Sequence, residues 1–179
     1  MSGPSQACVD EESAAAARPG LPRGAPVAAS EKGDEARLLQ AATRPRKLYV
    51  EPTNQCNLHC RMCLRHVWDE PPGQMSATHF ARIVAGLRAW SPPPTVFFGG
   101  QGEPLGHPDI VEMVAEVKAL GALTEMITNG TLLTEAKARG LIAAGLDRLW
   151  VSLDGARPET YMDIRLGAQL PQVIANVAR

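Results

Sequence analysis

Three closely spaced cysteines are the residues of this sequence best suited to chemistry. Cys56, Cys60 and Cys63 fall within eight residues and have a C-x3-C-x2-C spacing. Thiolates on one loop can hold several corners of an iron–sulfur cluster. Three ligands on a four-iron cluster leave one iron with an open coordination position, which is what a catalytic metal site needs. The spacing therefore favours a catalytic iron–sulfur cluster.

A structural zinc site is the alternative interpretation of the same cysteines. In that case His59 or a distant residue would supply the fourth ligand. Zinc sites usually present two separated pairs of ligands, and this sequence contains no second pair. The remaining cysteine, Cys8, lies far from the others, and we assign it no role. Clustered cysteines, in place of the spread cysteines of a disulfide scaffold, favour a reducing cytoplasm.

Further polar residues follow the apolar runs of the sequence and are candidates for binding a ligand. They are Gly100, Gly102, Glu103, Thr128, Asn129, Ser152 and Asp154. Glycine permits close backbone approach, and a carboxylate such as that of Glu103 can receive an ammonium group in a charge-assisted hydrogen bond. Asn-Gly, Asp-Gly and Gly-Pro pairs are also common in ordinary turns, so turn formation stays open as the alternative.

The elements that position these residues alternate between strands and helices. Apolar runs predict strands at residues 48–50, 96–98, 125–128 and 149–153. Helical periodicity and end signals predict helices at residues 76–90, 108–120 and 134–144, and from 158 onward. This alternation is typical of parallel β-α-β units and predicts an α/β fold. In such sheets functional groups collect at the carboxyl ends of the strands, so we expect the candidate residues to share one edge.

Composition and charge divide the chain and argue against several partners. Residues 1–45 are rich in Ala, Gly, Pro and Arg and are predicted to be a disordered tail, whereas residues 46–179 form the folded core. A net charge of −1 and a pI near 6.4 favour neither nucleic acid nor an anionic membrane surface. No apolar segment is long enough to span a bilayer, and we expect no signal peptide. The expected location is the cytoplasm.

The stretch from Glu51 to Cys63 resembles the signature loop of the radical SAM superfamily. The resemblance implies a TIM-barrel-like fold, a partial (β/α)6 barrel of which the first four β/α units are present. It also implies that Cys56, Cys60 and Cys63 bind a [4Fe-4S] cluster, and that the amino and carboxylate groups of S-adenosylmethionine (SAM) chelate its open iron. The closing segment, residues 171–179, stops before a fifth strand, so we expect a C-terminally truncated core.

The other candidate residues also have counterparts in that superfamily. Residues 100–104 resemble its glycine–glycine–glutamate motif with one residue interposed, which implies that Glu103 binds the amino group of SAM. Thr128, Asn129, Ser152 and Asp154 are similar in position to residues that contact the methionyl carboxylate or the ribose. Met62 stands where many members carry an aromatic residue against the adenine, and a methionine can fill that surface.

The resemblance implies reductive cleavage of SAM to methionine and a 5′-deoxyadenosyl radical. Residues 98–109 look similar to members that modify peptides or mature metal cofactors, including tungsten-oxidoreductase maturases. The implied partners are SAM, an electron donor such as a ferredoxin or flavodoxin, and a peptide, protein or cofactor-precursor substrate. Two alternatives stay open: a non-catalytic zinc-binding or redox-sensing module, and a cluster-binding fragment without activity.

Overall fold

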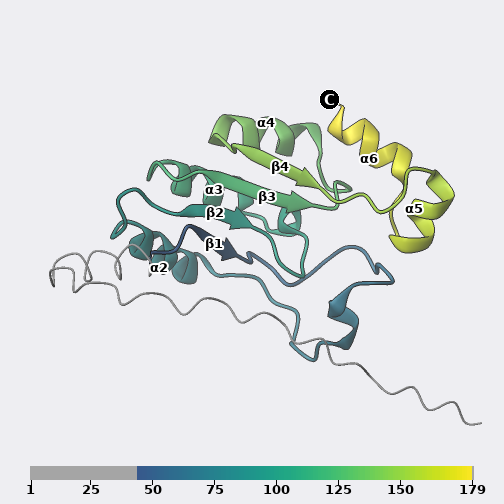
Figure 1. Cartoon of the computed structure of the whole chain (residues 1–179), viewed down its shortest axis with the longest axis horizontal. Coiled ribbons are helices and arrows are strands. Elements are labelled where there is room, and N and C mark those ends of the chain that lie inside the picture. The colour runs from purple at the N-terminus through teal and green to yellow at the C-terminus, as the bar shows by residue number, and fades with distance from the viewer. Residues whose placement is uncertain (1–43, 179) are drawn as a thin grey trace, which may run out of the picture. The chain divides into compact units, whose positions relative to one another are not determined.

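A single four-stranded parallel sheet organises the folded part of the chain. The computed structural model describes residues 44–178, and the predicted tail lies almost wholly outside them. The strands are β1 (Lys47–Val50), β2 (Thr95–Phe98), β3 (Thr124–Thr128) and β4 (Arg148–Val151), in the spatial order β1-β2-β3-β4 (Figure 1). All neighbouring strands pair in parallel, which confirms the predicted α/β class and sheet.

Helices connect and follow the strands in the order expected for β-α-β units. They are α2 (Ala77–Leu87), α3 (Ile110–Lys118), α4 (Glu135–Ala144), α5 (Pro158–Ile164) and α6 (Leu170–Val177). Two short 3-10 turns, η1 (Leu64–Val67) and η2 (Pro104–Gly106), follow the cysteines and Glu103. None of the helices within residues 44–178 is long and apolar enough to cross a membrane.

Side chains at the helix ends explain where two of the helices begin and stop. The Ser76 hydroxyl accepts a hydrogen bond from the backbone N–H of His79 at 3.2 Å and caps α2. The Thr134 hydroxyl caps α4 in the same way by accepting from the backbone N–H of Lys137. Gly145 closes α4 with φ of 83°, a left-handed conformation that favours glycine.

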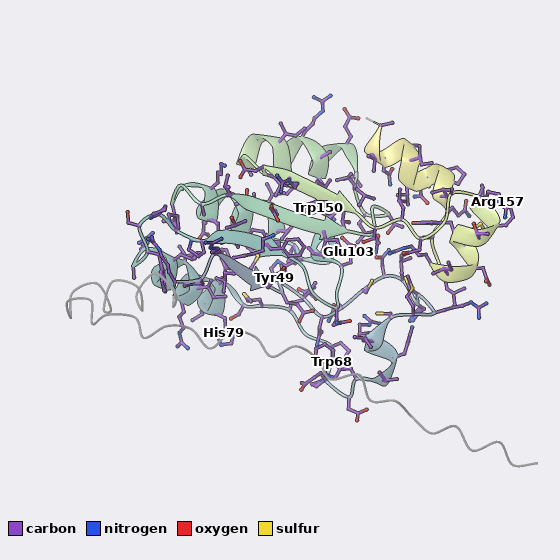
Figure 2. The ribbon with its side chains drawn as sticks, viewed as in Figure 1. Tyr49, Trp68, His79, Glu103, Trp150 and Arg157 are labelled. Carbon is purple, nitrogen blue, oxygen red and sulfur yellow. The ribbon has the colours of Figure 1, made fainter. Side chains whose placement is uncertain are left out.

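The main hydrophobic core lies between one face of the sheet and helices α2, α3 and α4. It contains Val50, Val96, Phe98 and Met126 from the strands and Phe80, Val84, Ile110, Val114, Val117 and Leu141 from the helices. Successive strand residues point to opposite faces, so the alternate residues of each strand leave this core. Tyr49 and Trp150 occupy such alternate positions and are 67% and 48% exposed. Figure 2 labels both side chains on their strands. They lie on the sheet face that these three helices do not cover.

A second, smaller core lies beside the cysteine loop. It is formed by Leu58, Tyr161, Ala168, Leu170 and Val173, and Cys56 and Cys60 pack against it. Leu58 belongs to the cysteine loop, whereas the other four residues belong to α5, α6 and the segment between them. The late helices therefore give the loop an apolar support.

Several helix and strand ends differ from the predicted ones by two or three residues. Helix α2 ends at Leu87 and not at Trp90, and β4 ends at Val151 and not at Leu153. Helix α3 begins at Ile110, since Asp109 has non-helical dihedral angles and takes the cap position. Periodicity identifies such elements well, but their last turns depend on local hydrogen bonds that periodicity does not encode.

Candidate functional site

A cavity of about 200 Å³ lies at the carboxyl ends of the strands and gathers most of the predicted site residues. Its lining contains Cys56, Cys60, Met62, Cys63, Gly100, Gly102, Glu103, Thr128, Asn129 and Ser152. Leu58, Gln101, Ile127 and Arg165 complete the lining. Figure 2 shows Glu103 at this end of the sheet. Asp154 is the predicted site residue that is not part of the lining.

The cysteine loop is held by backbone hydrogen bonds as well as by apolar packing. The His59 N–H donates to the Leu166 carbonyl at 3.1 Å, and the Arg61 N–H donates to the Ile164 carbonyl at 2.9 Å. The three thiols are free and partly buried. These contacts fix the loop between β1 and α5 while leaving its sulfur atoms on the cavity.

The three thiols are of the ligand type that iron–sulfur clusters use. No three His, Cys, Asp or Glu side chains within residues 44–178 converge closely enough to hold one metal ion. A cluster bound through a different iron by each thiolate does not require such convergence. Burial raises the pKa of the Cys60 thiol, and the nearby Arg165 guanidinium opposes this shift in part. The raised pKa favours the protonated thiol in the cluster-free protein.

The loop after β2 packs directly on the cysteine loop, which explains its glycines. A Cβ added at Gly102 would lie 2.0 Å from the Thr53 carbonyl oxygen, and one added at Gly100 would lie 2.2 Å from the Glu51 carboxylate. That carboxylate accepts hydrogen bonds from the N–H groups of Gln101 at 2.5 Å and Gly102 at 3.3 Å. Glycine is needed at position 102 because the two backbones touch there, whereas at position 100 the close neighbour is the Glu51 side chain. Glu51 was not singled out in the sequence, although its place immediately after β1 puts it at this edge.

Glu103 is buried beneath the cavity and already accepts three hydrogen bonds. Its Oε1 accepts from the Thr128 hydroxyl at 2.6 Å and the Leu105 N–H at 3.1 Å, and its Oε2 accepts from the Asn129 N–H at 2.7 Å. The residue is 3% exposed, and burial raises the pKa of its carboxyl group, which the three hydrogen bonds oppose. A carboxylate has about four acceptor positions, so these three hydrogen bonds leave one position unused.

The ends of β3 and β4 place their polar residues differently. The Thr128 hydroxyl is engaged by Glu103, while the Ser152 backbone N–H donates to the Thr128 carbonyl and leaves Ser152 lining the cavity. Asp154 pairs with the Arg165 guanidinium, whose Nε donates to Oδ2 at 2.5 Å. Arg165 lines the cavity in its place. No sequence pattern indicated Arg165, which follows α5, because its position depends on how α5 folds back on the cysteine loop.

The chain thus carries a three-cysteine loop, the ligand type of iron–sulfur clusters, at the strand ends where parallel α/β sheets bind their ligands. Residues 50–179 match the family model described as the radical SAM superfamily. The chain therefore belongs to the radical SAM superfamily, as its cysteine loop predicts.

Relatives of known name support the same assignment. The chain is 37% identical over 129 residues to the tungsten-containing aldehyde ferredoxin oxidoreductase cofactor-modifying protein of Pyrococcus furiosus, covering 72% of this chain and 36% of the relative. It is 36% identical to the AdoMet-dependent heme synthase of Methanosarcina barkeri, with the same two coverages. The chain thus spans about a third of the length of these relatives.

Solved structures share the fold at lower sequence identity. SuiB of Streptococcus suis, bound to precursor peptide SuiA, has a TM-score of 0.65 at 22% identity and matches 79% of this chain and 32% of its own. BtrN in complex with AdoMet and 2-DOIA has a TM-score of 0.59 at 23% identity. The match covers 70% of this chain and 48% of the BtrN chain. These similarities confirm the predicted fold: the chain corresponds to part of a larger radical SAM barrel.

Proposed function

We propose that Cys56, Cys60 and Cys63 bind a [4Fe-4S] cluster and that the cavity beside them binds SAM. The observation that carries this proposal is that all three thiols and the buried Glu103 carboxylate line one cavity. When bound, the cluster supplies an electron for reductive cleavage of SAM to methionine and a 5′-deoxyadenosyl radical. The residues of this chain orient SAM and shield the site from water.

The cavity offers one anionic and one cationic group to the methionyl part of SAM. The free acceptor position of Glu103 suits the ammonium group, and the largely buried Arg165 guanidinium suits the carboxylate. Ser152 is the candidate for a ribose hydroxyl, because the Thr128 hydroxyl is already bound to Glu103. Asp154 then acts through Arg165, which it orients. Met62, at the cavity edge, is the candidate for contact with the adenine.

The substrate class is a peptide or a precursor of a metal cofactor. The support comes from relatives: one is named a cofactor-modifying protein, and the PqqA peptide cyclase of Streptomyces rochei is 31% identical over 78% of this chain. A cytoplasmic ferredoxin or flavodoxin would provide the electron. These assignments concern the whole protein, of which the chain covers the cofactor-binding part.

Anaerobic reconstitution with iron and sulfide, followed by a 5′-deoxyadenosine assay with dithionite and SAM, tests the proposal. We expect a brown protein with four irons per chain and formation of 5′-deoxyadenosine. A variant with Cys56, Cys60 and Cys63 all changed to Ala is the control and should give neither. Tight binding of one zinc ion without iron uptake would favour the zinc-binding alternative. A loaded cluster without SAM cleavage would favour a cluster-binding fragment.

A further inference from the structure

We infer that Asn129 donates an N–H···S hydrogen bond to the thiolate of Cys56 and thereby raises the reduction potential of the cluster. The Asn129 side-chain nitrogen lies 3.8 Å from the Cys56 sulfur. This inference rests on the proposed function, since it requires Cys56 to be a cluster ligand. It gives Asn129 a role different from the SAM contact that the sequence suggests.

The neighbouring hydrogen bonds fix which end of the Asn129 amide faces the sulfur. The backbone N–H of Thr131 lies 2.9 Å from Oδ1 of Asn129, and a backbone N–H can only donate. The atom facing Thr131 must therefore be the amide oxygen, and the atom facing Cys56 must be the NH2 group. The Thr131 hydroxyl also donates to that oxygen at 2.6 Å.

The remaining amide hydrogen of Asn129 is used inside the same network. Nδ2 donates to Oδ1 of Asn57 at 3.0 Å, and Nδ2 of Asn57 donates to the Thr131 hydroxyl at 2.8 Å. Both donor and both acceptor positions of Asn129 are thus occupied by protein groups. Its side chain has no group left for SAM, and its one sulfur contact is to a proposed cluster ligand.

Hydrogen bonds on two sides hold the turn that carries Asn129, as a directed hydrogen bond to sulfur requires. Its backbone N–H donates to Glu103, and the side chain of Asn176 donates to the Gly130 carbonyl at 2.9 Å. Asn129 is 6% exposed, so water does not compete freely for its amide. The turn after β3 is therefore held from below by Glu103 and from α6 by Asn176.

The electrostatic consequence follows from where negative charge accumulates. Reduction adds an electron to the cluster and increases the negative charge on its thiolate ligands. A donated N–H stabilises the reduced form more than the oxidised form, so it raises the reduction potential. Removing the donor while keeping the side-chain volume should make the potential more negative. Reduction of the cluster by a given electron donor then becomes less favourable.

The test is a redox titration of the reconstituted cluster, monitored by electron paramagnetic resonance, in the wild type, Asn129→Leu and Thr131→Val. Asn129→Leu removes the donor to sulfur at similar volume. Thr131→Val removes a hydroxyl from the same network but keeps the Asn129 donor, because the Thr131 N–H still orients the amide. We expect a more negative midpoint potential in Asn129→Leu and an unchanged one in Thr131→Val, at equal iron content.

Equal midpoint potentials in all three proteins would overturn the inference, as would equal shifts in both variants, which would point to the loop network as a whole. If Asn129→Leu fails to load, Asn129→Ser, whose side chain is too short to reach the sulfur, takes its place with the same expectation. Failure of both Asn129 variants to load, with normal loading of Thr131→Val, would make Asn129 an assembly residue and refute the redox role. A wild-type protein that assembles no cluster would instead refute the proposed function.

Discussion

The Thr128 hydroxyl donates to the Glu103 carboxylate at 2.6 Å and thereby joins the ends of β2 and β3 beneath the cavity. A carboxylate has about four acceptor positions. Glu103 uses three of these positions within the protein, which leaves one for the proposed contact with the SAM ammonium group. This arrangement links stability and ligand binding in one residue, and the two roles can be separated experimentally.

Glu103→Gln should weaken SAM binding while leaving the cluster in place. The substitution keeps the shape but removes the charge, and loss of one charge-assisted hydrogen bond costs ~1.5–3 kcal/mol, or about a tenfold to hundredfold in affinity. Titration of the reconstituted protein with SAM, followed by electron paramagnetic resonance, measures the change. The exposed Glu116→Gln on α3 is the matched control and should bind SAM normally. Unchanged SAM affinity in Glu103→Gln would mean that Glu103 has a structural role and does not bind SAM.

The stability of the cluster-free protein should fall as the pH rises above the ordinary range of a carboxyl group. Burial raises the pKa of Glu103 in the folded state above its ordinary value of 4.5. The folded chain therefore holds this proton more tightly than the unfolded chain, so the contribution of Glu103 declines from pH 4.5 upward until the raised pKa is passed.

Urea unfolding at a series of pH values, in wild type and Glu103→Gln, isolates this effect. The difference in unfolding free energy, variant minus wild type, should increase across that window, because glutamine does not titrate. The amide group of the variant also faces the Asn129 N–H, which costs stability equally at every pH. A pH-independent difference would contradict the raised pKa.

Each single change of Cys56, Cys60 or Cys63 to Ala should abolish the four-iron cluster, because each thiolate is expected to hold a different iron. Iron and sulfide analysis together with the visible absorption spectrum would measure the loss. Cys8→Ala is the internal control and should keep full iron content and SAM cleavage. Full loading in any one of the three variants would remove that cysteine from the ligand set.

Arg165→Gln should weaken SAM binding through loss of the cation facing the cavity. Arg165 is oriented by Asp154 and lies among the cavity residues. The change removes the charge-assisted contact proposed for the methionyl carboxylate, so the affinity should fall by about tenfold or more. Asp154→Asn keeps the guanidinium but weakens its orientation, and a smaller loss is expected. If both variants bind SAM as the wild type does, the carboxylate is held elsewhere.

The sequence predicted the sheet, the order of the elements and the cysteine loop because each depends on local pattern. Apolar runs and turn residues predicted all four strands. Ten of the residues that line the cavity were predicted from the cysteine loop and the strand ends. Arg165 and Glu51 escaped prediction because their roles arise from contacts between distant segments. The exposure of Tyr49 and Trp150 could not be predicted, since residue type alone does not tell which face of a sheet is covered.

Gly102 should be required for the cysteine loop to pack closely on the loop after β2. A Cβ there would meet backbone atoms, the Thr53 carbonyl oxygen at 2.0 Å and the Gln55 carbonyl oxygen at 2.7 Å, and backbone cannot rotate away as a side chain can. Gly102→Ala should therefore push the two loops apart, destabilise the protein by ~1–3 kcal/mol and lower cluster loading. Urea unfolding and iron analysis measure the two effects.

Gly86→Ala provides the opposite control for the same substitution. Gly86 lies on the exposed side of α2, and a Cβ there would meet nothing within 4 Å. Because alanine favours the helix over glycine, this variant should be more stable than the wild type by about 0.5–1 kcal/mol and load the cluster normally. A Gly102→Ala protein with wild-type stability and iron content would show that the two loops need not touch as they do here. Close packing of the loop after β2 on the cysteine loop would then not be required to form the site.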